Sequence, residues 1–338
     1  MRILVTGGAG FIGSNFVHYL FHQYGGAPAE HCCPDHKPPT TAPASTDLQV
    51  LNFDALTYAG SLHHLRGIDQ APGYRFEKAD ICDTARVNAL VNEFRPEAII
   101  HFAAESHVDR SIEAGDVFVR TNVLGTQVLL DAARRYDVGQ FLHVSTDEVY
   151  GSIEKGSFHE GSPLSPSSPY SASKAGSDLL VLAHHHTYGL PVAITRCTNN
   201  YGPRQNPEKL LPKIITLASQ NKPLPIYGTG MNVRDWLYVK DHCEAIDLVR
   251  QQRRWGEIWN IGASDERPNL EVVHAVLRKL GKPDSLIQFV KDRPGHDWRY
   301  SLDSGKLRKL GWKPRVTFEE GLRHTIGWLS THPAEVRP

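Results

Sequence analysis

The chain has few cysteines, no long hydrophobic run and no excess of charge, and each of these absences excludes a class of protein. Five cysteines in 338 residues are too few, and odd in number, for a disulfide framework, and they favour a reducing compartment. No apolar run reaches the roughly 18–20 residues that a membrane span needs. The 37 basic and 37 acidic residues give zero net charge, which argues against a general nucleic-acid binder.

Two segments of unusual composition bear on location and metal binding. The apolar run at residues 3–5 ends in glycines, so we expect no signal peptide and a cytoplasmic location. Residues 25–47 hold five prolines and no hydrophobic period, which predicts a mobile surface insert. Within it, the adjacent cysteines of residues 31–36 (HCCPDH) lack the spacing of zinc ligands, and we expect no metal site.

Short apolar runs alternate with helical patterns over the first 200 residues. At about 150 residues per domain the length suggests two units. Strands are expected at 3–5, 48–53, 74–78, 98–102, 140–145 and 192–196, and helices at 11–24, 84–94, 118–136 and 170–188. This alternation predicts an α/β fold with a doubly wound, Rossmann-like parallel sheet. We expect a dinucleotide-binding domain at 1–198, to which 236–262 returns, and a smaller mixed region at 199–338.

A glycine-rich loop lies between the first expected strand and helix. Gly7, Gly10 and Gly13 permit close backbone approach, and the helix that begins at Phe11 and Ile12 offers free N–H groups to a pyrophosphate. The second strand ends at Asp54, which is suited to the adenosine ribose and favours NAD over NADP.

The sequence offers two further acidic residues for the adenosine end of this site. Asp47 is the rival to Asp54, although it precedes the strand. Asp80, with Ile81, follows the third strand and is suited to the adenine edge; a helix cap is the alternative role for Asp80.

Five polar residues form a candidate catalytic set. Tyr170 and Lys174 are four residues apart on an expected helix, where the ammonium would lower the pKa of the phenol and make it a general base. Thr146 follows the fifth strand and can bind the same hydroxyl as Tyr170. Asp147 and Glu148 come next and can act as acid and base if their environments separate their pKa values. A solvated turn is the alternative for this pair.

The chain resembles the extended short-chain dehydrogenase/reductase family and, within it, the dTDP-glucose 4,6-dehydratases. The matching stretches are 7–13 (GGAGFIG), 54–60 (DALTYAG), 103–111 (AAESHVDRS), 146–151 (TDEVYG), 199–203 (NNYGP), 232–236 (NVRDW) and 292–297 (DRPGHD). Epimerases and reductases of this superfamily usually lack the Asp147–Glu148 pair. The resemblance implies that Tyr170 takes the C4 hydroxyl proton, Glu148 the C5 proton, and Asp147 protonates the departing C6 hydroxyl. The product would be a nucleotide-linked 4-keto-6-deoxyglucose.

The resemblance also implies binding residues and an assembly. Further NAD contacts would come from Ala55, Thr57, Gly60, Phe102, Ala103, Ala104, Thr121 and Asn199, together with Tyr170 and Lys174. The sugar nucleotide would be held, with Thr146, by Ser106, Asn200, Glu208, Lys209, Leu210, Pro225, Tyr227, Arg234, Asn260, Arg293, His296 and Tyr300. A homodimer would form through the expected helices at 118–136 and 170–188.

Three other functions compete with the dTDP-glucose dehydratase. A UDP-sugar 4,6-dehydratase would use the same chemistry on another base, and a C4 epimerase would need no Asp–Glu pair. A non-catalytic NAD-binding regulator is a third possibility, since fold alone does not decide function. The intact set from Thr146 to Lys174 argues against the regulator.

Overall fold

The computed structural model describes residues 1–25 and 47–332. The expected insert, with the run of residues 31–36, lies almost wholly outside the described residues. Within the described part, no helix combines the length and apolarity that crossing a bilayer requires.

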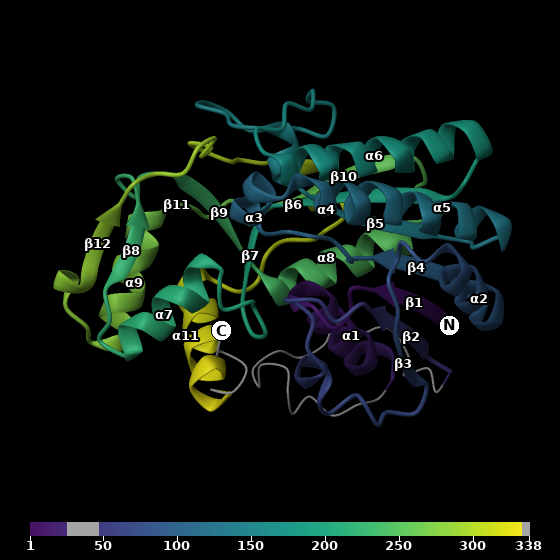
Figure 1. Ribbon diagram of the computed structural model, residues 1–338, viewed down its shortest axis with the longest axis horizontal. Helices are drawn as coiled ribbons and strands as arrows, with labels where there is room; N and C mark the ends of the chain where they lie inside the picture. The colour runs from purple at the N-terminus through teal and green to yellow at the C-terminus, as the bar shows by residue number, and fades with distance from the viewer. Residues whose placement is uncertain (26–46, 333–338) are drawn as a thin grey trace.

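A seven-stranded parallel sheet forms the centre of the molecule (Figure 1). Its strand order is β10-β6-β5-β4-β1-β2-β3. The strands are β1 (Arg2–Thr6), β2 (Gln49–Asp54), β3 (Tyr74–Lys78), β4 (Ala98–His101), β5 (Phe141–Thr146), β6 (Val192–Cys197) and β10 (Glu257–Ile261). Central strands such as β1 and β4 are buried on both faces, which explains their near-continuous aliphatic sequences. The expected doubly wound α/β fold is confirmed.

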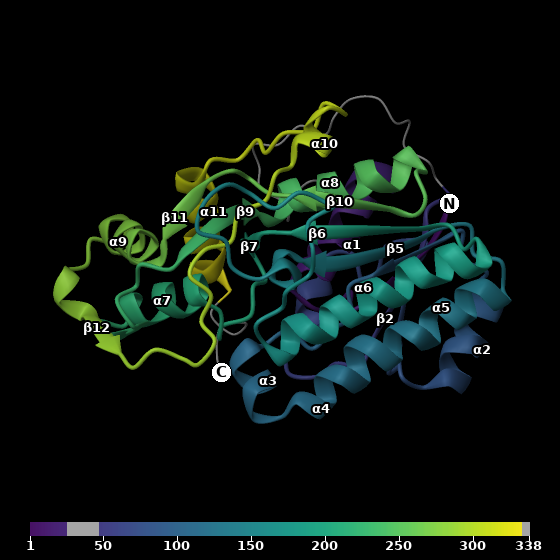
Figure 2. The ribbon, with the colours of Figure 1, turned by 90° about the horizontal axis from the view of Figure 1, so that it is seen from above.

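Helices cover both faces of this sheet. On one face α1 (Phe11–Tyr24) packs against α8 (Val239–Gln252). The other face carries α2 (Thr84–Phe94), α5 (Gly125–Arg135) and α6 (Pro169–Tyr188), of which α5 and α6 run side by side (Figure 2). Two apolar cores result, one on each side of the sheet.

The helix expected at 118–136 is not uniform. It is preceded by α3 (Val108–Glu113) and begins as α4 (Gly115–Phe118), widens into a π-helical segment at Val119–Leu124, and continues as α5. Such segments interrupt α-helices frequently at functional sites. Here the widening changes which side chains face the sheet.

A smaller lobe is built mainly from the chain after residue 198 (left in Figure 1). It contains the strands β7 (Asn199–Tyr201), β9 (Val233–Tyr238) and β11 (Glu266–Pro268) in one sheet and β8 (Leu224–Tyr227) and β12 (Ile287–Val290) in another. Its helices are α7 (Leu210–Ser219), α9 (Asn269–Leu280) and α11 (Phe318–Thr331), and α10 (Gly305–Arg308) lies beside β10. A third apolar core joins these helices to the small sheets.

Candidate active site

A cavity of about 320 Å³ opens at the carboxyl ends of the central strands, where ligands bind in open α/β sheets. All five candidate catalytic residues and all of the expected NAD-binding residues line it. The NAD set comprises Gly7, Gly10, Phe11, Ile12, Gly13, Asp54, Ala55, Thr57, Gly60, Asp80, Ile81, Phe102, Ala103, Ala104, Thr121, Tyr170, Lys174 and Asn199. The fold thus brings together residues that are up to 192 positions apart, from Gly7 to Asn199.

The glycines of the loop allow its backbone to pack closely against neighbouring backbone segments. Gly7 has a φ of +71°, and a Cβ there would lie 2.5 Å from the backbone nitrogen of Ala103. A Cβ on Gly13 would overlap the backbone oxygen of Gly7. No side chain caps α1, whose N-cap is Gly10. The uncapped helix end therefore turns its N–H groups toward the cavity and fits the pyrophosphate of NAD.

Asp54 ties the glycine loop to the end of β2. One carboxylate oxygen accepts from Ala9 N at 3.0 Å and the other from Leu56 N at 2.8 Å. Burial raises the pKa of Asp54, while these backbone N–H groups oppose the rise. A third backbone N–H, that of Gly10, also bonds to this carboxylate, and the fourth of its lone pairs remains for a ribose hydroxyl. Asp47 is exposed and does not line the cavity.

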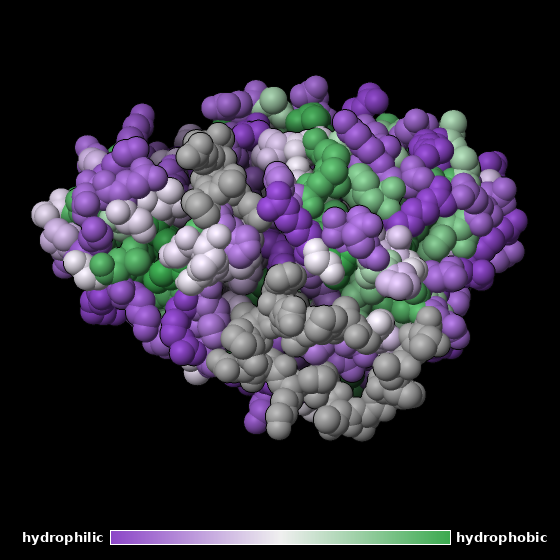
Figure 3. Space-filling view, turned by 90° about the horizontal axis from the view of Figure 1, so that it is seen from below, coloured by the Kyte–Doolittle hydropathy of each residue, from purple (hydrophilic) through white to green (hydrophobic). Residues whose placement is uncertain are grey.

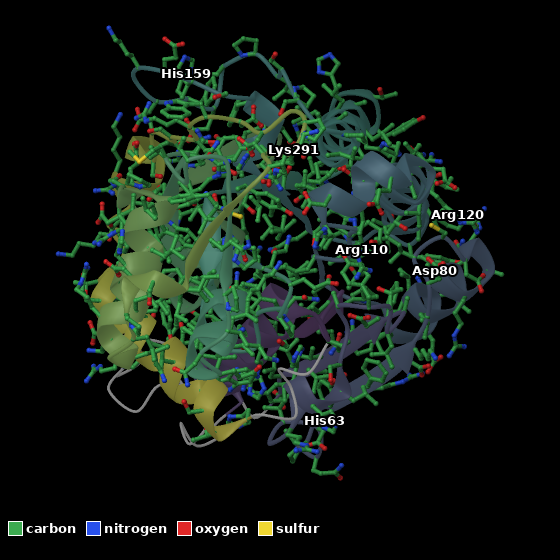
Figure 4. All side chains as sticks on the ribbon, turned by 60° about the vertical axis from the view of Figure 1, so that its left-hand side comes forward. His63, Asp80, Arg110, Arg120, His159 and Lys291 are labelled. Atoms are coloured by element: carbon green, nitrogen blue, oxygen red, sulfur yellow. The ribbon has the colours of Figure 1, made fainter. Side chains whose placement is uncertain are left out.

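Asp80 lies beside the helical segment that carries Arg120 (Figure 4), where Cys82 Sγ contacts the backbone oxygen of Arg120. The alternative role of Asp80 as a helix cap is not observed. Asp83 instead caps α2, by accepting from Arg86 N at 3.0 Å. Asp80 Oδ1 accepts from Cys82 N, and the residue lines the cavity.

The Asp147–Glu148 pair begins a short 3-10 turn directly after β5. Thr146 Oγ1 accepts from Glu148 N at 3.3 Å and donates to Asp147 Oδ1 at 3.2 Å. Asp147 is 3% exposed, and its Oδ2 has no hydrogen-bond partner among the described residues. Burial and the charge of Glu148 raise the pKa of Asp147 well above its usual value, which favours the protonated form of this carboxyl. The arrangement is not the solvated turn that was the alternative.

Glu148 has a different environment from its neighbour. Burial raises its pKa as well, but the charges of Lys209, Arg234 and Arg293 oppose the rise. These cations favour the carboxylate form of Glu148, whereas Asp147 has fewer of them nearby. The two side chains are therefore separated in proton affinity, as an acid–base pair requires.

Tyr170 and Lys174 both line the cavity, but the expected effect of the lysine on the phenol is not seen. Burial and the charge of Glu148 raise the pKa of Tyr170 well above its usual value, and the hydrogen bond with Thr146 only partly opposes this. The expectation of a lowered pKa is wrong for this structure. The reason is geometric, because Lys174 Nζ donates to the backbone oxygen of Val144 at 2.9 Å and lies 3.3 Å from His143.

Four of the expected substrate residues line the same cavity: Ser106, Thr146, Asn200 and Lys209. Lys209 Nζ donates to the backbone oxygen of Ser106 at 2.9 Å, which joins the small lobe to the sheet domain. Glu208 pairs with Arg110 at 2.6 Å. Arg110 comes from α3, in the middle of the view in Figure 4.

A second polar group lies beyond this cavity lining, between β8 and residues 291–300. Arg293 Nη1 and Tyr227 Oη both contact Asp109, at 3.1 and 3.4 Å. His296 contacts Asp292 at 2.6 Å, and its ring meets the Tyr227 ring edge-on. Lys291 marks the start of this segment in Figure 4. The group presents a guanidinium and a phenol hydroxyl, which are donors of the kind that bind phosphate oxygens.

Arg234 on β9 packs against Tyr300, which lies at the end of residues 291–300, and both support this group. The guanidinium of Arg234 lies 4.2 Å from the centre of the Tyr300 ring and donates to the backbone oxygen of Asp297. Tyr300 is 3% exposed, and its hydroxyl donates to Asp297 at 2.6 Å.

Asn260 lies apart from the other expected substrate residues. It is fully buried on β10, where its side chain accepts from Tyr150 Oη at 2.9 Å and donates to the backbone oxygen of Phe158. In this conformation both polar atoms of the side chain bond within the protein, and a substrate contact of Asn260 stays a prediction. Leu210 is the first residue of α7, and Pro225 lies within β8. Neither residue lines the cavity.

Asn122 and Glu105 were not assigned from the sequence. Asn122 lies in the π-helical segment, accepts from Glu105 N at 2.9 Å, and donates to Glu105 O and Ser173 Oγ. It thereby fixes the loop that follows β4 against α6. The sequence pattern of residues 103–111 includes Glu105, so this residue could have been proposed from the sequence. The contact with Asn122 depends on the π-helical segment, which the sequence pattern does not predict.

Comparisons with known proteins agree on one family. Residues 44–325 match the family model described as GDP-mannose 4,6 dehydratase. The chain is 49% identical to dTDP-glucose 4,6-dehydratase of Xanthomonas campestris pv. campestris (strain B100), with 99% of this chain and 94% of that protein covered. The crystal structure of DesIV, a dTDP-glucose 4,6-dehydratase from Streptomyces venezuelae with NAD and TYD bound, has a TM-score of 0.90 and 49% identity.

That comparison covers 99% of this chain and 98% of DesIV. The UDP-glucose 4-epimerase of Thermus thermophilus, crystallised with NAD, shares the fold at a TM-score of 0.85 but only 32% identity, over 98% and 99% of the two chains. The match to dehydratases is thus stronger in sequence than the match to this epimerase, and it agrees with the Asp147–Glu148 pair at the cavity. The chain therefore belongs to the dTDP-glucose 4,6-dehydratase family, NAD-dependent hydro-lyases of the extended short-chain dehydrogenase/reductase type.

Proposed function

We propose that this chain converts dTDP-glucose to dTDP-4-keto-6-deoxyglucose and water. The observation that carries the proposal is the buried Asp147 beside Glu148, in one cavity with Tyr170. The choice of a dTDP sugar is supported by the relatives' names and by the TYD in DesIV.

Tyr170 and Thr146 would act first, at the C4 hydroxyl. Thr146 Oγ1 lies next to Tyr170 Oη and orients the sugar hydroxyl toward it. Tyr170 Oη takes the proton of that hydroxyl as the C4 carbonyl forms. NAD, when bound along the glycine loop, supplies the hydride acceptor for C4 and the hydride donor for C6. Burial and Glu148 raise the pKa of Tyr170, and bound ligands would have to lower it for the phenolate to act as the base.

Glu148 and Asp147 would then divide the elimination of water. The C4 carbonyl acidifies the C5 proton, which the Glu148 carboxylate removes. Asp147 gives its proton to the departing C6 hydroxyl, and a protonated, poorly solvated carboxyl is suited to this role. The low exposure of the site also keeps bulk water from the unsaturated intermediate.

The cations of the small lobe would hold the diphosphate. Lys209, Arg234 and Arg293 are close enough to Glu148 to affect its pKa. A bound diphosphate would engage the same charges, since arginine and lysine are the usual partners of phosphate oxygens. We accordingly propose that residues 1–198, with 236–262, bind NAD and that the remainder of 199–338 mainly binds the sugar nucleotide.

Mass spectrometry tests this function directly. The purified protein is incubated with dTDP-glucose and, in parallel, with UDP-glucose, without added reductant. Loss of one water from dTDP-glucose supports the proposal. Loss from UDP-glucose alone overturns the choice of base, and no mass change with either substrate overturns the dehydratase assignment. Tyr170→Phe serves as the negative control, because it removes the proton acceptor and leaves the cavity shape nearly unchanged.

We also propose a homodimer formed through the region of α4, α5 and α6. Several large apolar side chains are exposed on these helices and on the adjoining segment: Val117, Val119, Leu124, Leu179 and Tyr188. Val119, Leu124 and Leu180 line one shallow depression. The opposite face of the molecule, seen in Figure 3, mixes hydrophilic and hydrophobic side chains. Exposed apolar groups gathered on neighbouring helices are typical of homodimer surfaces.

A cytoplasmic location is proposed from the state of the cysteines. The three cysteines within the described ranges, Cys82, Cys197 and Cys243, are free thiols. Free thiols are expected in a reducing compartment.

A further inference from the structure

A buried polar cluster lies directly beneath Lys174, and the proposed mechanism gives its other members no role. It is formed by His143 on β5, Asp178 on α6 and Arg196 on β6, which are 0%, 0% and 2% exposed. Burying ionic groups is costly unless they are paired. The catalytic cavity lies on one side of Lys174 and this cluster on the other.

Contacts within the cluster converge on one imidazole nitrogen. His143 Nε2 lies 3.3 Å from Lys174 Nζ, 3.1 Å from Ser177 Oγ and 3.4 Å from Asp178 Oδ1. Lys174, Ser177 and Asp178 follow one another on the same face of α6. The second carboxylate oxygen of Asp178 accepts from Arg196 Nε at 2.8 Å. When Nε2 accepts from Lys174 it carries no hydrogen for Asp178, so the Asp178 carboxylate, which Arg196 fixes in place, acts on the lysine through its charge.

The charges explain how the lysine remains an ammonium inside the protein. Burial lowers the pKa of Lys174 to about 8, and the charge of Asp178 opposes that loss. Burial likewise lowers the pKa of His143 to about 4, so the imidazole is neutral near pH 7 and can accept from Lys174. The titratable groups that act on Lys174 come from four elements: His101 on β4, His143 on β5, Cys197 on β6 and Asp178 on α6. Arg196 on β6 acts on Asp178 and His143.

We propose that His143 and Asp178 are positioning residues for Lys174, which fix its ammonium group at the floor of the cavity and keep it charged during the reaction. This inference rests on the proposed function for its kinetic consequence. Its structural part, the placement and protonation of Lys174, concerns this chain alone.

The test uses a matched pair of variants at His143. His143→Gln retains an amide oxygen that can accept from Lys174, whereas His143→Met has a similar length and no such acceptor. Asp178→Asn is the direct test of the carboxylate, but it leaves Arg196 buried without its partner and can fail to fold. The His143 pair adds no charge and removes none at neutral pH.

Two readouts are measured on the NAD-loaded enzyme. The titration of Lys174 is followed by NMR of protein labelled at lysine Cε, with Lys174→Met identifying the resonance. The pH dependence of kcat for dTDP-glucose is followed in parallel. Loss of a hydrogen bond to a charged group should move the Lys174 titration, and the alkaline limb of kcat, about one pH unit lower in His143→Met. His143→Gln should stay within a few tenths of a unit of the wild type.

The outcomes separate this inference from the proposed function. If both variants lose thermal stability equally while the Lys174 titration stays in place, the cluster is only structural and the inference is overturned. A Lys174 titration that shifts as expected supports the positioning role even if the wild type removes no water from dTDP-glucose. In that case the proposed function fails and the kinetic part of the inference fails with it.

Discussion

At the scale of single residues, the two adjacent carboxyl groups can be assigned separate steps. Glu148→Gln removes the base for the C5 proton but leaves Tyr170 and Thr146 in place. We expect water loss from dTDP-glucose to fall by about 10²–10⁴-fold, while oxidation at C4 still occurs. The measurement is rapid-mixing absorbance of the reduced cofactor together with deuterium incorporation at C5 from heavy water.

The neighbouring variant Asp147→Asn is the control for this assignment. It should slow release of the C6 hydroxyl and still permit exchange at C5, because Glu148 remains. If Glu148→Gln removes water at the wild-type rate, the C5 base lies elsewhere in the cavity.

Asp147 also makes a pH-dependent contribution to stability. Burial and Glu148 raise its folded-state pKa above the value of about 3.9 in an unfolded chain. A raised pKa means that the stabilising contribution is complete below the unfolded value and is lost as the pH rises toward the folded value. Asp147→Asn does not titrate, so its melting temperature relative to the wild type should increase between about pH 4.5 and about pH 7.5. Calorimetry at both pH values checks this, and a difference that does not change with pH would contradict it.

At the scale of elements, the turn from β1 into α1 depends on the absence of one side chain. A Cβ on Gly13, in the first turn of α1, would overlap the backbone oxygen of Gly7. The loop that contains Gly7 cannot easily move away, because Asp54 accepts a hydrogen bond from Ala9 N. Gly13→Ala should therefore lower the free energy of unfolding by about 1–3 kcal/mol and reduce the NAD content of the purified protein.

A glycine in another helix provides the matched control. Gly327 lies in α11 with open space around its Cβ position, and Gly327→Ala should raise the stability by about 0.5–1 kcal/mol. NAD content and chemical denaturation are measured for both variants. Equal effects of the two substitutions would show that the loop does not require Gly13.

The same elements show what the sequence alone can specify. The first six strands of the main sheet are short runs rich in apolar residues, and the structure places them within one or two residues of their expected positions. The short strands β7, β8 and β11 have no comparable pattern, because they are stabilised by partners distant in sequence. The position of Asn122 in the π-helical segment likewise involves a contact with Glu105. The direction of the Lys174 side chain involves its hydrogen bond to the backbone oxygen of Val144. Sequence patterns therefore indicated which residues meet at the cavity better than how their charges interact there.

At the scale of the whole molecule, the exposed apolar side chains of α4, α5 and α6 and the segment between them predict self-association. Leu124, 48% exposed, lies in the depression that Val119 and Leu180 also line. Leu124→Glu places a carboxylate in the proposed interface and should weaken the dimer by about 3 kcal/mol, or roughly 100-fold in dissociation constant. Phe289→Glu is the matched control, since Phe289 is 56% exposed but lies on β12 in the other lobe. Sedimentation equilibrium should show a dimer for the wild type and Phe289→Glu and mostly monomer for Leu124→Glu. A monomeric wild type would contradict the proposed dimer. A Leu124→Glu protein that dimerises as tightly as the wild type would place the dimer interface on another surface.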